Sequence, residues 1–166
     1  MISARILKPG NVLCGVSARG KKHCLEILSE LLANTSPEMP HEEIFAKLAE
    51  RERLGSTGLG GGVAFPHCRF AGIDETRAAL LKLAEPIEFE SPDDEPVDLV
   101  FGVMVPEEIT DDHRDEITTI SETLKEQSFQ ARLRSATTAR ELYEAFISGQ
   151  REAGVVPAAR KLSRGS

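Results

Sequence analysis

The segment Val97–Val105 is an almost unbroken apolar run, and it constrains the fold more than any other feature of the chain. Successive side chains of a β-strand point to opposite faces, so a strand that is apolar at consecutive positions needs cover on both sides. The run therefore predicts a central strand in a sheet. Further strands are predicted at Asn11–Val16 and Thr76–Leu83, with a brief strand-like stretch at Val63–Phe65.

The helical spacing of apolar residues marks two helices in the first third of the sequence. The first is predicted over Arg19–Asn34, with Ser17 as its cap. The second follows Pro40, a residue that suits the first position of a helix, and ends near Arg53. Acidic residues directly after Pro40 agree with the positive end of a helix dipole.

Two more helices are predicted in the last third of the sequence. Asp111 or Asp112 caps the first of them, and Thr138–Glu141 has the pattern of a capping box that opens the other. The chain thus runs from one strand through two helices and several strands to further helices. Because strands and helices do not alternate strictly, we expect a single-domain α/β protein with a mixed central sheet in a three-layer α/β/α arrangement.

The composition of the 166 residues bounds the class of protein. Basic and acidic residues number 20 and 27, so the formal net charge is −7. This acidic balance, with one tyrosine and no tryptophan for stacking, argues against nucleic acid and anionic membranes as partners. The sequence shows neither a membrane-length apolar run nor a signal-peptide start, so we expect no membrane insertion and a cytoplasmic location.

The cysteines indicate a reducing compartment. Cys14, Cys24 and Cys68 cannot all pair with one another, and an odd, sparse number is typical of intracellular proteins. A His-Cys dipeptide occurs twice, at His23 and at His67. Adjacent residues rarely point the same way, however, and zinc sites use wider spacings, so we expect no metal site.

Residues 149–166 differ in composition from the rest of the chain. They carry four basic residues and one acidic residue, and they lack apolar periodicity. We therefore expect one domain over residues 1–148 and a basic, disordered tail over residues 149–166. A tail peptide that docks on a partner is the alternative.

Five glycines lie within the eight residues of Gly55–Gly62. Glycine permits positive φ angles and a close approach of ligand to backbone, so that successive amides can surround an anion. Two familiar phosphate motifs are absent, because no lysine follows as in a P-loop and Val63 stands where a dinucleotide fold has its third glycine. The segment is either an anion-binding loop of another kind or a plain surface loop.

The residues around this segment favour phosphate chemistry. Arg51 is a permanent cation that can hold a phosphate with two donors, and Ser56 and Thr57 add hydroxyls. His67 follows a proline, which restricts the backbone before it. A neutral imidazole is a nucleophile toward phosphorus at cellular pH, and phosphohistidine is a labile phosphoryl donor. A lone histidine is more often structural or merely exposed, but these neighbours make His67 a candidate nucleophile.

Gly55–Gly58 together with Val63–His67 resembles the active-site signature of the enzyme IIA domains of the fructose/mannitol class. These domains belong to the phosphoenolpyruvate-dependent phosphotransferase system. Within the class, the sequence is most similar to the nitrogen-regulatory enzyme IIA proteins. The similarity spans about residues 5 to 148 and includes three more stretches: Arg19–Leu32, Asp94–Phe101, and Val105–Pro106 leading to His113.

The resemblance implies a phosphoryl relay. His67 matches the family histidine that accepts a phosphoryl group from a small phosphorylated carrier, HPr or its nitrogen-branch counterpart. His113 matches a second family histidine beside the site, and Arg51 matches an arginine that precedes the glycine-rich segment. Charge on the phosphoryl oxygens would be stabilised by hydroxyls and amides of the loop, at Ser56, Thr57, Gly58 and Gly60. No cofactor, metal or nucleotide is implied for this step.

The sequence departs from the family pattern at two places. Cys68 stands where the family usually has glycine after the active histidine, and it is either a small buried residue or a redox-sensitive thiol. The helix that begins near His113 is more charged than usual. This second departure concerns the contact surface for partners more than the chemistry.

Acidic residues are concentrated between Glu85 and Glu116, where thirteen carboxylates accompany a single basic residue, Arg114. A solvated acidic face is the ordinary explanation. Alternatively, an acidic rim around an apolar patch steers a basic carrier protein toward the site by long-range attraction.

The implied function is that of a histidine phosphocarrier with a mainly regulatory role, whose binding to target proteins depends on phosphorylation. By resemblance, such targets are kinases or transporters. Two alternatives stay open: an enzyme IIA component that passes phosphate to a separate sugar permease subunit, and a regulatory binding domain that no longer transfers phosphate. The cytoplasmic domain of a transporter would be joined to membrane spans, and the sequence contains none.

Overall fold

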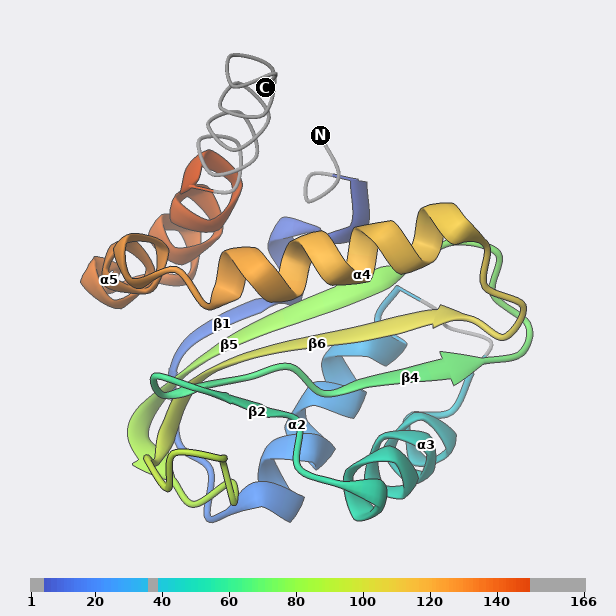
Figure 1. Ribbon diagram of the computed structural model, residues 1–166, viewed down its shortest axis with the longest axis horizontal. Coiled ribbons are helices and arrows are strands. Elements are labelled where there is room, and N and C mark those ends of the chain that lie inside the picture. Colours follow the sequence, from blue (N-terminus) through green and yellow to red (C-terminus); the bar gives the residue numbers. More distant parts are fainter. Residues whose placement is uncertain (1–4, 36–38, 150–166) are drawn as a thin grey trace.

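The computed structural model describes residues 5–35 and 39–149 (Figure 1). Residues 139–149 form the last helix of this part. The elements before it follow one another in this order: η1 (Pro9–Asn11), β1 (Val12–Val16), α2 (Lys21–Ala33), α3 (His41–Leu54), β2 (Gly58–Gly60), β3 (Val63–Ala64), β4 (His67–Phe70), β5 (Arg77–Ile87), β6 (Val97–Pro106), α4 (Asp111–Leu124) and α5 (Gln127–Ser135).

The six described strands form one mixed sheet in the order β1-β5-β6-β3-β2, with β4 also paired to β6. Strands β1 and β5 are parallel, β5 and β6 are antiparallel, and β3 and β4 both run parallel to β6. The mixed sheet and the central position of the apolar strand are therefore confirmed. Strand β6 is central, because β5 pairs with one of its edges and β3 and β4 pair with the other.

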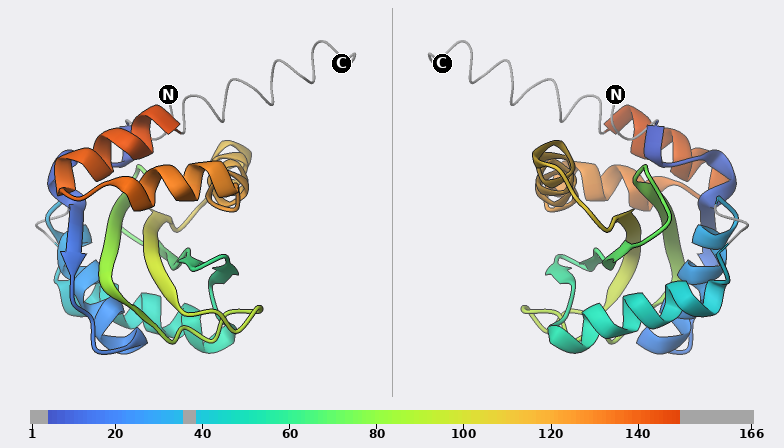
Figure 2. Two further views of the ribbon diagram at one scale, coloured as in Figure 1. Left: turned by 90° about the vertical axis from the view of Figure 1, so that its left-hand side faces the viewer. Right: turned by 90° about the vertical axis from the view of Figure 1, so that its right-hand side faces the viewer.

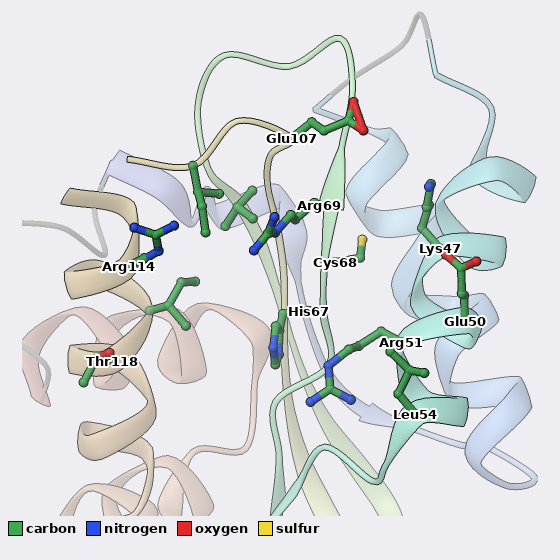
Figure 3. A pocket seen from close by; sticks show the side chains of 13 residues that line it. Lys47, Glu50, Arg51, Leu54, His67, Cys68, Arg69, Glu107, Arg114 and Thr118 are labelled. Atoms are coloured by element: carbon green, nitrogen blue, oxygen red, sulfur yellow. The ribbon is translucent and has the colours of Figure 1, made fainter. Parts of the chain in front are cut away.

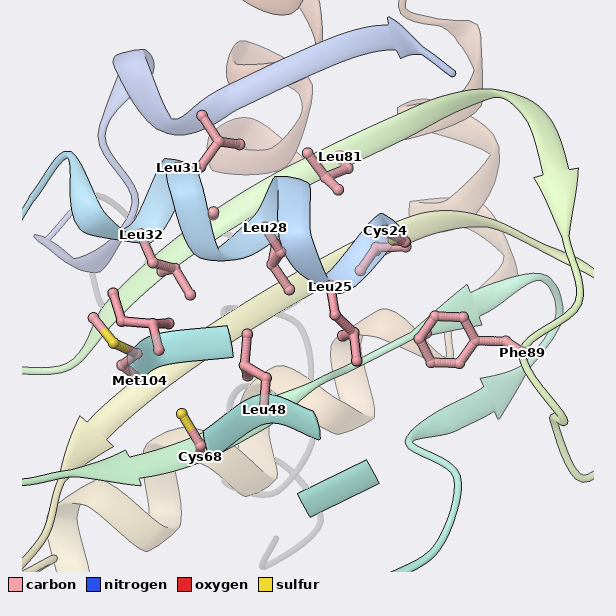
Figure 4. Close-up of a cluster of buried hydrophobic side chains, with 14 of the residues drawn as sticks. Cys24, Leu25, Leu28, Leu31, Leu32, Leu48, Cys68, Leu81, Phe89 and Met104 are labelled. Carbon is pink, nitrogen blue, oxygen red and sulfur yellow. The ribbon is translucent and has the colours of Figure 1, made fainter. Parts of the chain in front are cut away.

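Helices cover both faces of the sheet, as the apolar run predicted (Figure 2). Val100 and Met104 of β6 belong to a buried cluster with α2 and α3, shown in Figure 4. Leu99, Phe101 and Val103 belong to a second cluster with α4, α5 and the last helix. A strand buried on both faces removes a large apolar area from water, which makes β6 the centre of a three-layer α/β/α domain.

Gly102 shows how closely α2 approaches the central strand. A Cβ atom at this position would lie 2.3 Å from a methyl carbon of Leu28, on the sheet-facing side of α2. The absence of a side chain here allows helix and sheet to pack in direct contact.

The beginnings of α2 and α3 differ slightly from the prediction. Helix α2 begins at Lys21 with Gly20 as N-cap, so Ser17 is not its cap. Pro40 is the N-cap of α3 rather than its first helical residue, with an extended ψ of 140°. The fixed φ of proline suits either position, which is why the sequence alone could not distinguish them.

The two later helices are capped by threonines. The expected cap at Asp111 or Asp112 is wrong, because Thr110 precedes the first turn and its side chain accepts from the amide of His113. At the last helix, the hydroxyl of Thr138 accepts from the amide of Glu141 at 3.1 Å, as predicted. Threonine competes well with aspartate for this position, since either oxygen can accept from an amide of the first turn.

Two short strands were missed by the sequence analysis. Strand β2 lies inside the glycine-rich segment and pairs antiparallel with β3, with Gly60, Gly61 and Gly62 at positive φ in the connection. Strand β4 begins at His67 itself. Neither has the length or alternation that identifies a strand in sequence; β2 forms by pairing with β3, and β4 forms by pairing with β6.

The predicted tail lies, from residue 150 onward, outside the described residues. No helix in residues 5–35 and 39–149 has both the length and the apolar character needed to cross a membrane.

Candidate active site

His67 is held in a defined orientation at the start of β4. Its ring Nδ1 lies 2.8 Å from the carbonyl oxygen of Phe65, and the Phe65 ring packs against it with centroids 5.1 Å apart. Because a carbonyl oxygen can only accept a hydrogen bond, this contact assigns the proton to Nδ1. The lone pair is then on Nε2, the nitrogen that a reacting group can approach.

The surroundings of His67 keep its imidazole neutral. Burial lowers the pKa of His67, and the positive charge of Arg51 lowers it further. The carbonyl of Phe65 and the negative charge of Glu52 act in the opposite direction, but the net pKa stays below the ordinary value of 6.5. A neutral ring at neutral pH is the form that a nucleophile requires.

Two hollows meet at His67. The larger, of about 840 Å³, lies between α3, β4 and α4 (Figure 3), and the smaller, of about 380 Å³, extends toward the glycine-rich segment. Four residues line both hollows: Arg51, His67, Ile117 and Thr118. The histidine is therefore reachable from two sides.

The two hollows gather positive charge in an acidic protein. Their charged lining residues are the cations Lys47, Arg51, Arg69, Arg114 and Lys125, and the carboxylates Glu50, Glu107 and Glu122. Five cations against three carboxylates contrast with the formal net charge of −7 for the whole chain. This arrangement favours a bound anion beside His67.

Arg51 lines both hollows together with His67. It lies in the last turn of α3, where its Nη1 donates to the carbonyl oxygen of Gly55 at 2.9 Å. Figure 3 shows its guanidinium reaching from α3 toward His67. The remaining donors of the planar group can bind phosphoryl oxygens in the same hollow.

Ser56 and Thr57 line the smaller hollow, but their hydroxyl protons are used within the protein. Ser56 Oγ donates to the carbonyl of Phe89 at 2.7 Å and accepts from the amide of Gly58. Thr57 is buried, and its hydroxyl donates to Oε1 of Glu52 at 2.6 Å. A direct contact between either hydroxyl proton and a phosphoryl oxygen would require the side chain to turn.

The two predicted glycines lie at different hollows. Gly58 lines the smaller hollow beside His67, and a Cβ there would lie 2.2 Å from Oγ of Ser91. Gly60 lines a separate hollow with Asp93, whose carboxylate accepts from the amide of Gly61 at 2.9 Å. The anion at the glycine turn of this structure is therefore a side chain of the protein itself.

His113 is not brought to the hollows in this arrangement. It is the third residue of α4, and its Nδ1 accepts from the amide of Thr110 at 3.1 Å as part of a capping box. The neighbouring residue Arg114 lines the larger hollow instead. The side chain of His113 would have to leave its capping contact to reach a group on His67.

Cys68 lines the larger hollow and belongs to the buried cluster between the sheet and α3 (Figures 3 and 4). Burial raises the pKa of its thiol to about 12, so the thiolate needed for oxidation is scarce at neutral pH. These observations favour the interpretation of Cys68 as a small buried residue.

Glu52, which was not predicted from the sequence, is buried directly behind the site. The signal was available, because Ile44, Leu48 and Glu52 recur at four-residue intervals on the buried face of α3. An acidic residue at the third position of such a series indicates a buried carboxylate with partners. Among the described residues, no group of three or more histidines, cysteines and carboxylates could hold a metal ion.

A family model matches nearly the whole described chain. It is named "Phosphoenolpyruvate-dependent sugar phosphotransferase system, EIIA 2" and matches residues 5–149. The chain belongs to this family and is an enzyme IIA domain of the phosphotransferase system.

Within the family, the chain is homologous to nitrogen regulatory proteins, which confirms the resemblance found in the sequence. It is 41% identical to that of Pseudomonas aeruginosa over 146 residues, which are 88% of this chain and 95% of the relative. Identity to the Escherichia coli protein is 37% over 131 residues, 78% of this chain and 79% of the relative. The crystal structure of nitrogen regulatory protein IIA-Ntr from Neisseria meningitidis superimposes with a TM-score of 0.81 at 32% identity, covering 88% of this chain and 99% of that one.

Proposed function

We propose that this domain is a histidine phosphocarrier in which Nε2 of His67 accepts the phosphoryl group of an HPr-like carrier. The orientation of the ring supports this most strongly: Nδ1 is bound to the Phe65 carbonyl, and Nε2 remains for the reaction. The lowered pKa of His67 and the cations around it suit both the nucleophile and the group it would receive.

The proposed transfer needs no proton to be removed from Nε2. The lone pair of Nε2 attacks phosphorus in line, and the bond between phosphorus and the carrier's imidazole nitrogen breaks. The electron pair of that bond returns to the carrier's ring. The proton on Nδ1 of His67 stays in place against the Phe65 carbonyl, while Arg51 stabilises charge on the phosphoryl oxygens.

We also propose that His113 acts in this transfer after its side chain leaves Thr110. The variant His113→Gln separates this role from capping, because glutamine at the third helical position satisfies a capping box. We expect slower phosphoryl acceptance with an unchanged melting temperature. Acceptance at the wild-type rate would remove His113 from the reaction.

The regulatory part of the proposal rests on charge and on an apolar contact. A phosphoryl group brings roughly −1.5 to −2 charges at neutral pH into a region that holds an excess of cations. Leu54 stands at the rim of the larger hollow with 82% of its surface exposed, which suits contact with a partner. Phosphorylation would thus change which target protein binds this surface.

The direct test is intact-mass analysis after incubation with phosphoenolpyruvate, enzyme I and the carrier of the same organism. We expect one acid-labile phosphoryl adduct on the wild-type chain and none on His67→Ala. Separate detection of the phosphorylated carrier is the control. If the carrier is labelled and the wild-type chain is not, the proposed transfer is wrong, and the result favours a partner-binding domain that has kept the fold and lost transfer.

A further inference from the structure

Glu52 is a buried carboxylate that the transfer described above does not use. Its side chain is 5% exposed, and both oxygens are occupied. Oε1 accepts from the hydroxyl of Thr57 at 2.6 Å, and Oε2 accepts from the amide of Thr57 at 2.9 Å and from Nζ of Lys21 at 3.0 Å. A carboxylate is costly to bury without such partners, so three donors on one group make this a well-defined arrangement.

A chain of hydrogen bonds leads from this carboxylate to His67. The carbonyl of Thr57 accepts from the amide of Phe65 at 2.9 Å. The carbonyl of Phe65 in turn accepts from Nδ1 of His67 at 2.8 Å. Glu52 therefore holds Thr57, Thr57 holds Phe65, and Phe65 sets the orientation of His67.

Glu52 also acts on His67 through its charge. Burial is the main effect that lowers the pKa of His67, and the charges of Arg51 and Glu52 then act in opposite directions. Once Nε2 carries a phosphoryl group and Nδ1 keeps its proton, the ring itself is positively charged. A carboxylate held nearby in a partly buried region favours that form.

On the basis of the proposed phosphoryl transfer, we propose that Glu52 is a positioning residue, which acts through Thr57 and Phe65 to keep Nδ1 of His67 on its carbonyl partner and Nε2 directed at the hollows. Its negative charge stabilises the phosphorylated ring. The hydroxyl of Thr57 accordingly supports the histidine and does not bind the phosphoryl group.

The first test is Glu52→Gln in the full chain, with Glu90→Gln as matched control. Glu90 binds the same Lys21 at 2.8 Å, but its side chain is 76% exposed, and the carboxylate that binds Thr57 is that of Glu52. In Glu52→Gln, an amide NH2 replaces one carboxylate oxygen. This NH2 is a donor and would face one of the donors from which the carboxylate accepted, so the link to Thr57 is weakened. We expect kcat for phosphoryl acceptance to fall about tenfold, the factor that one lost charge-assisted hydrogen bond represents, with KM for the carrier unchanged.

The second readout is the state of the His67 ring before any reaction. Nitrogen-15 NMR of histidine-labelled protein reports the tautomer and the titration of each ring, and His67→Ala assigns the signal. In Glu52→Gln, we expect some Nε2–H tautomer and a titration midpoint below that of the wild type. Every charged group that lines the two hollows is unchanged in this variant. Glu90→Gln should match the wild type in both respects.

A pair of variants at Thr57 keeps the proposal testable if Glu52→Gln does not fold. Thr57→Ser retains the hydroxyl and should keep the wild-type tautomer and titration of His67, whereas Thr57→Val removes it and should slow transfer and shift the His67 titration in the same direction as Glu52→Gln. If the hydroxyl bound the phosphoryl group instead, Thr57→Val would slow transfer and leave the free ring unchanged, which would overturn the proposal.

The proposal would also be overturned if Glu52→Gln folded and its His67 had the tautomer, the titration and the rate of phosphoryl acceptance of the wild type. The NMR measurements do not depend on phosphoryl transfer. If the wild-type chain accepts no phosphoryl group, the proposed function fails, and the ring state of the variants still decides whether Glu52 positions His67.

Discussion

At the scale of the single residue, the chemistry of His67 follows from what surrounds its two ring nitrogens. One nitrogen is bound to a backbone carbonyl, so the other carries the lone pair. Burial and the nearby Arg51 lower the pKa of the ring, so it is neutral at cellular pH despite lying among hydrogen-bond partners. Reactivity here is a matter of tautomer and protonation, which the fold controls.

The lowered pKa of His67 predicts a characteristic pH profile. The neutral fraction of the ring is larger at each pH than for a free histidine, because protonation requires a lower pH. With a carrier that is already phosphorylated, the rate of acceptance should be constant at and above pH 7 and should fall only below the ordinary histidine pKa of 6.5. Stopped-flow or quench measurement over pH 5 to 8 tests this, and a midpoint above pH 7 would contradict it.

Arg51 offers a second prediction at this scale. Arg51→Lys keeps the charge but cannot reproduce a planar fork that binds both the Gly55 carbonyl and a phosphoryl oxygen. We expect acceptance to slow about tenfold. Arg53→Lys, two residues along the same helix and exposed, is the matched control and should be unchanged. Full activity of folded Arg51→Lys would show that a point charge is enough.

The sequence allowed some of these residues to be found and not others. His67 and Arg51 were predicted because they are part of a motif, and Glu52 was not predicted because only one of its two partner residues is near it in sequence. The amide and hydroxyl of Thr57 lie nearby, but Lys21 comes from α2. The contact of His113 with Thr110 is local, yet the sequence could not show which way the ring would turn.

At the scale of the element, the glycine-rich segment contains the short strand β2 and the turn at positive φ that leads to β3. Its glycines serve packing as much as ligand binding. A Cβ at Gly58 would lie 2.2 Å from Oγ of the buried Ser91, whereas a Cβ at Gly10 would meet nothing within 4 Å. The segment is therefore held against the chain between β5 and β6 rather than free at the surface.

This packing predicts a loss of stability in Gly58→Ala. We expect the free energy of unfolding to fall by about 1–3 kcal/mol, the usual cost of overpacking. Gly10→Ala is the control and should be close to neutral. Chemical denaturation of both variants provides the measurement. An unchanged stability of Gly58→Ala would mean that Ser91 moves aside freely.

Long elements could be predicted from the sequence, and short ones could not. The apolar spacing of α2 and the unbroken run of β6 are strong signals within one segment. Strands β2 and β4 have only three and four residues and exist through their pairing partners. These strands form through tertiary pairing, so no local sequence pattern predicts them.

At the scale of the whole molecule, the distribution of charge is uneven. The chain is acidic overall, but the hollows beside His67 carry more cations than carboxylates. In the proposed transfer, the acidic exterior would attract a basic carrier from a distance, and the cations would act on its phosphoryl group at short range. The single domain and its acidity could be read from composition, but the cationic site required the fold, because its members come from α3, β4 and α4.

This distribution predicts that association depends on salt. We expect kcat/KM for the carrier to fall as ionic strength rises, because the screening length is about 10 Å at 0.1 M salt. Neutralising Glu107 and Glu108, beside the larger hollow, should reduce that slope, whereas Glu26→Gln on α2 should not. A rate independent of ionic strength would remove the steering explanation.

The central claim is that Nε2 of His67 receives the phosphoryl group, and one measurement tests it most directly. Phosphorylated protein labelled with nitrogen-15 in its histidines should show coupling between phosphorus and Nε2 of a single ring, with the proton still on Nδ1. The signal should be absent from His67→Ala. Coupling to Nδ1, or an adduct that persists in His67→Ala, would contradict the account.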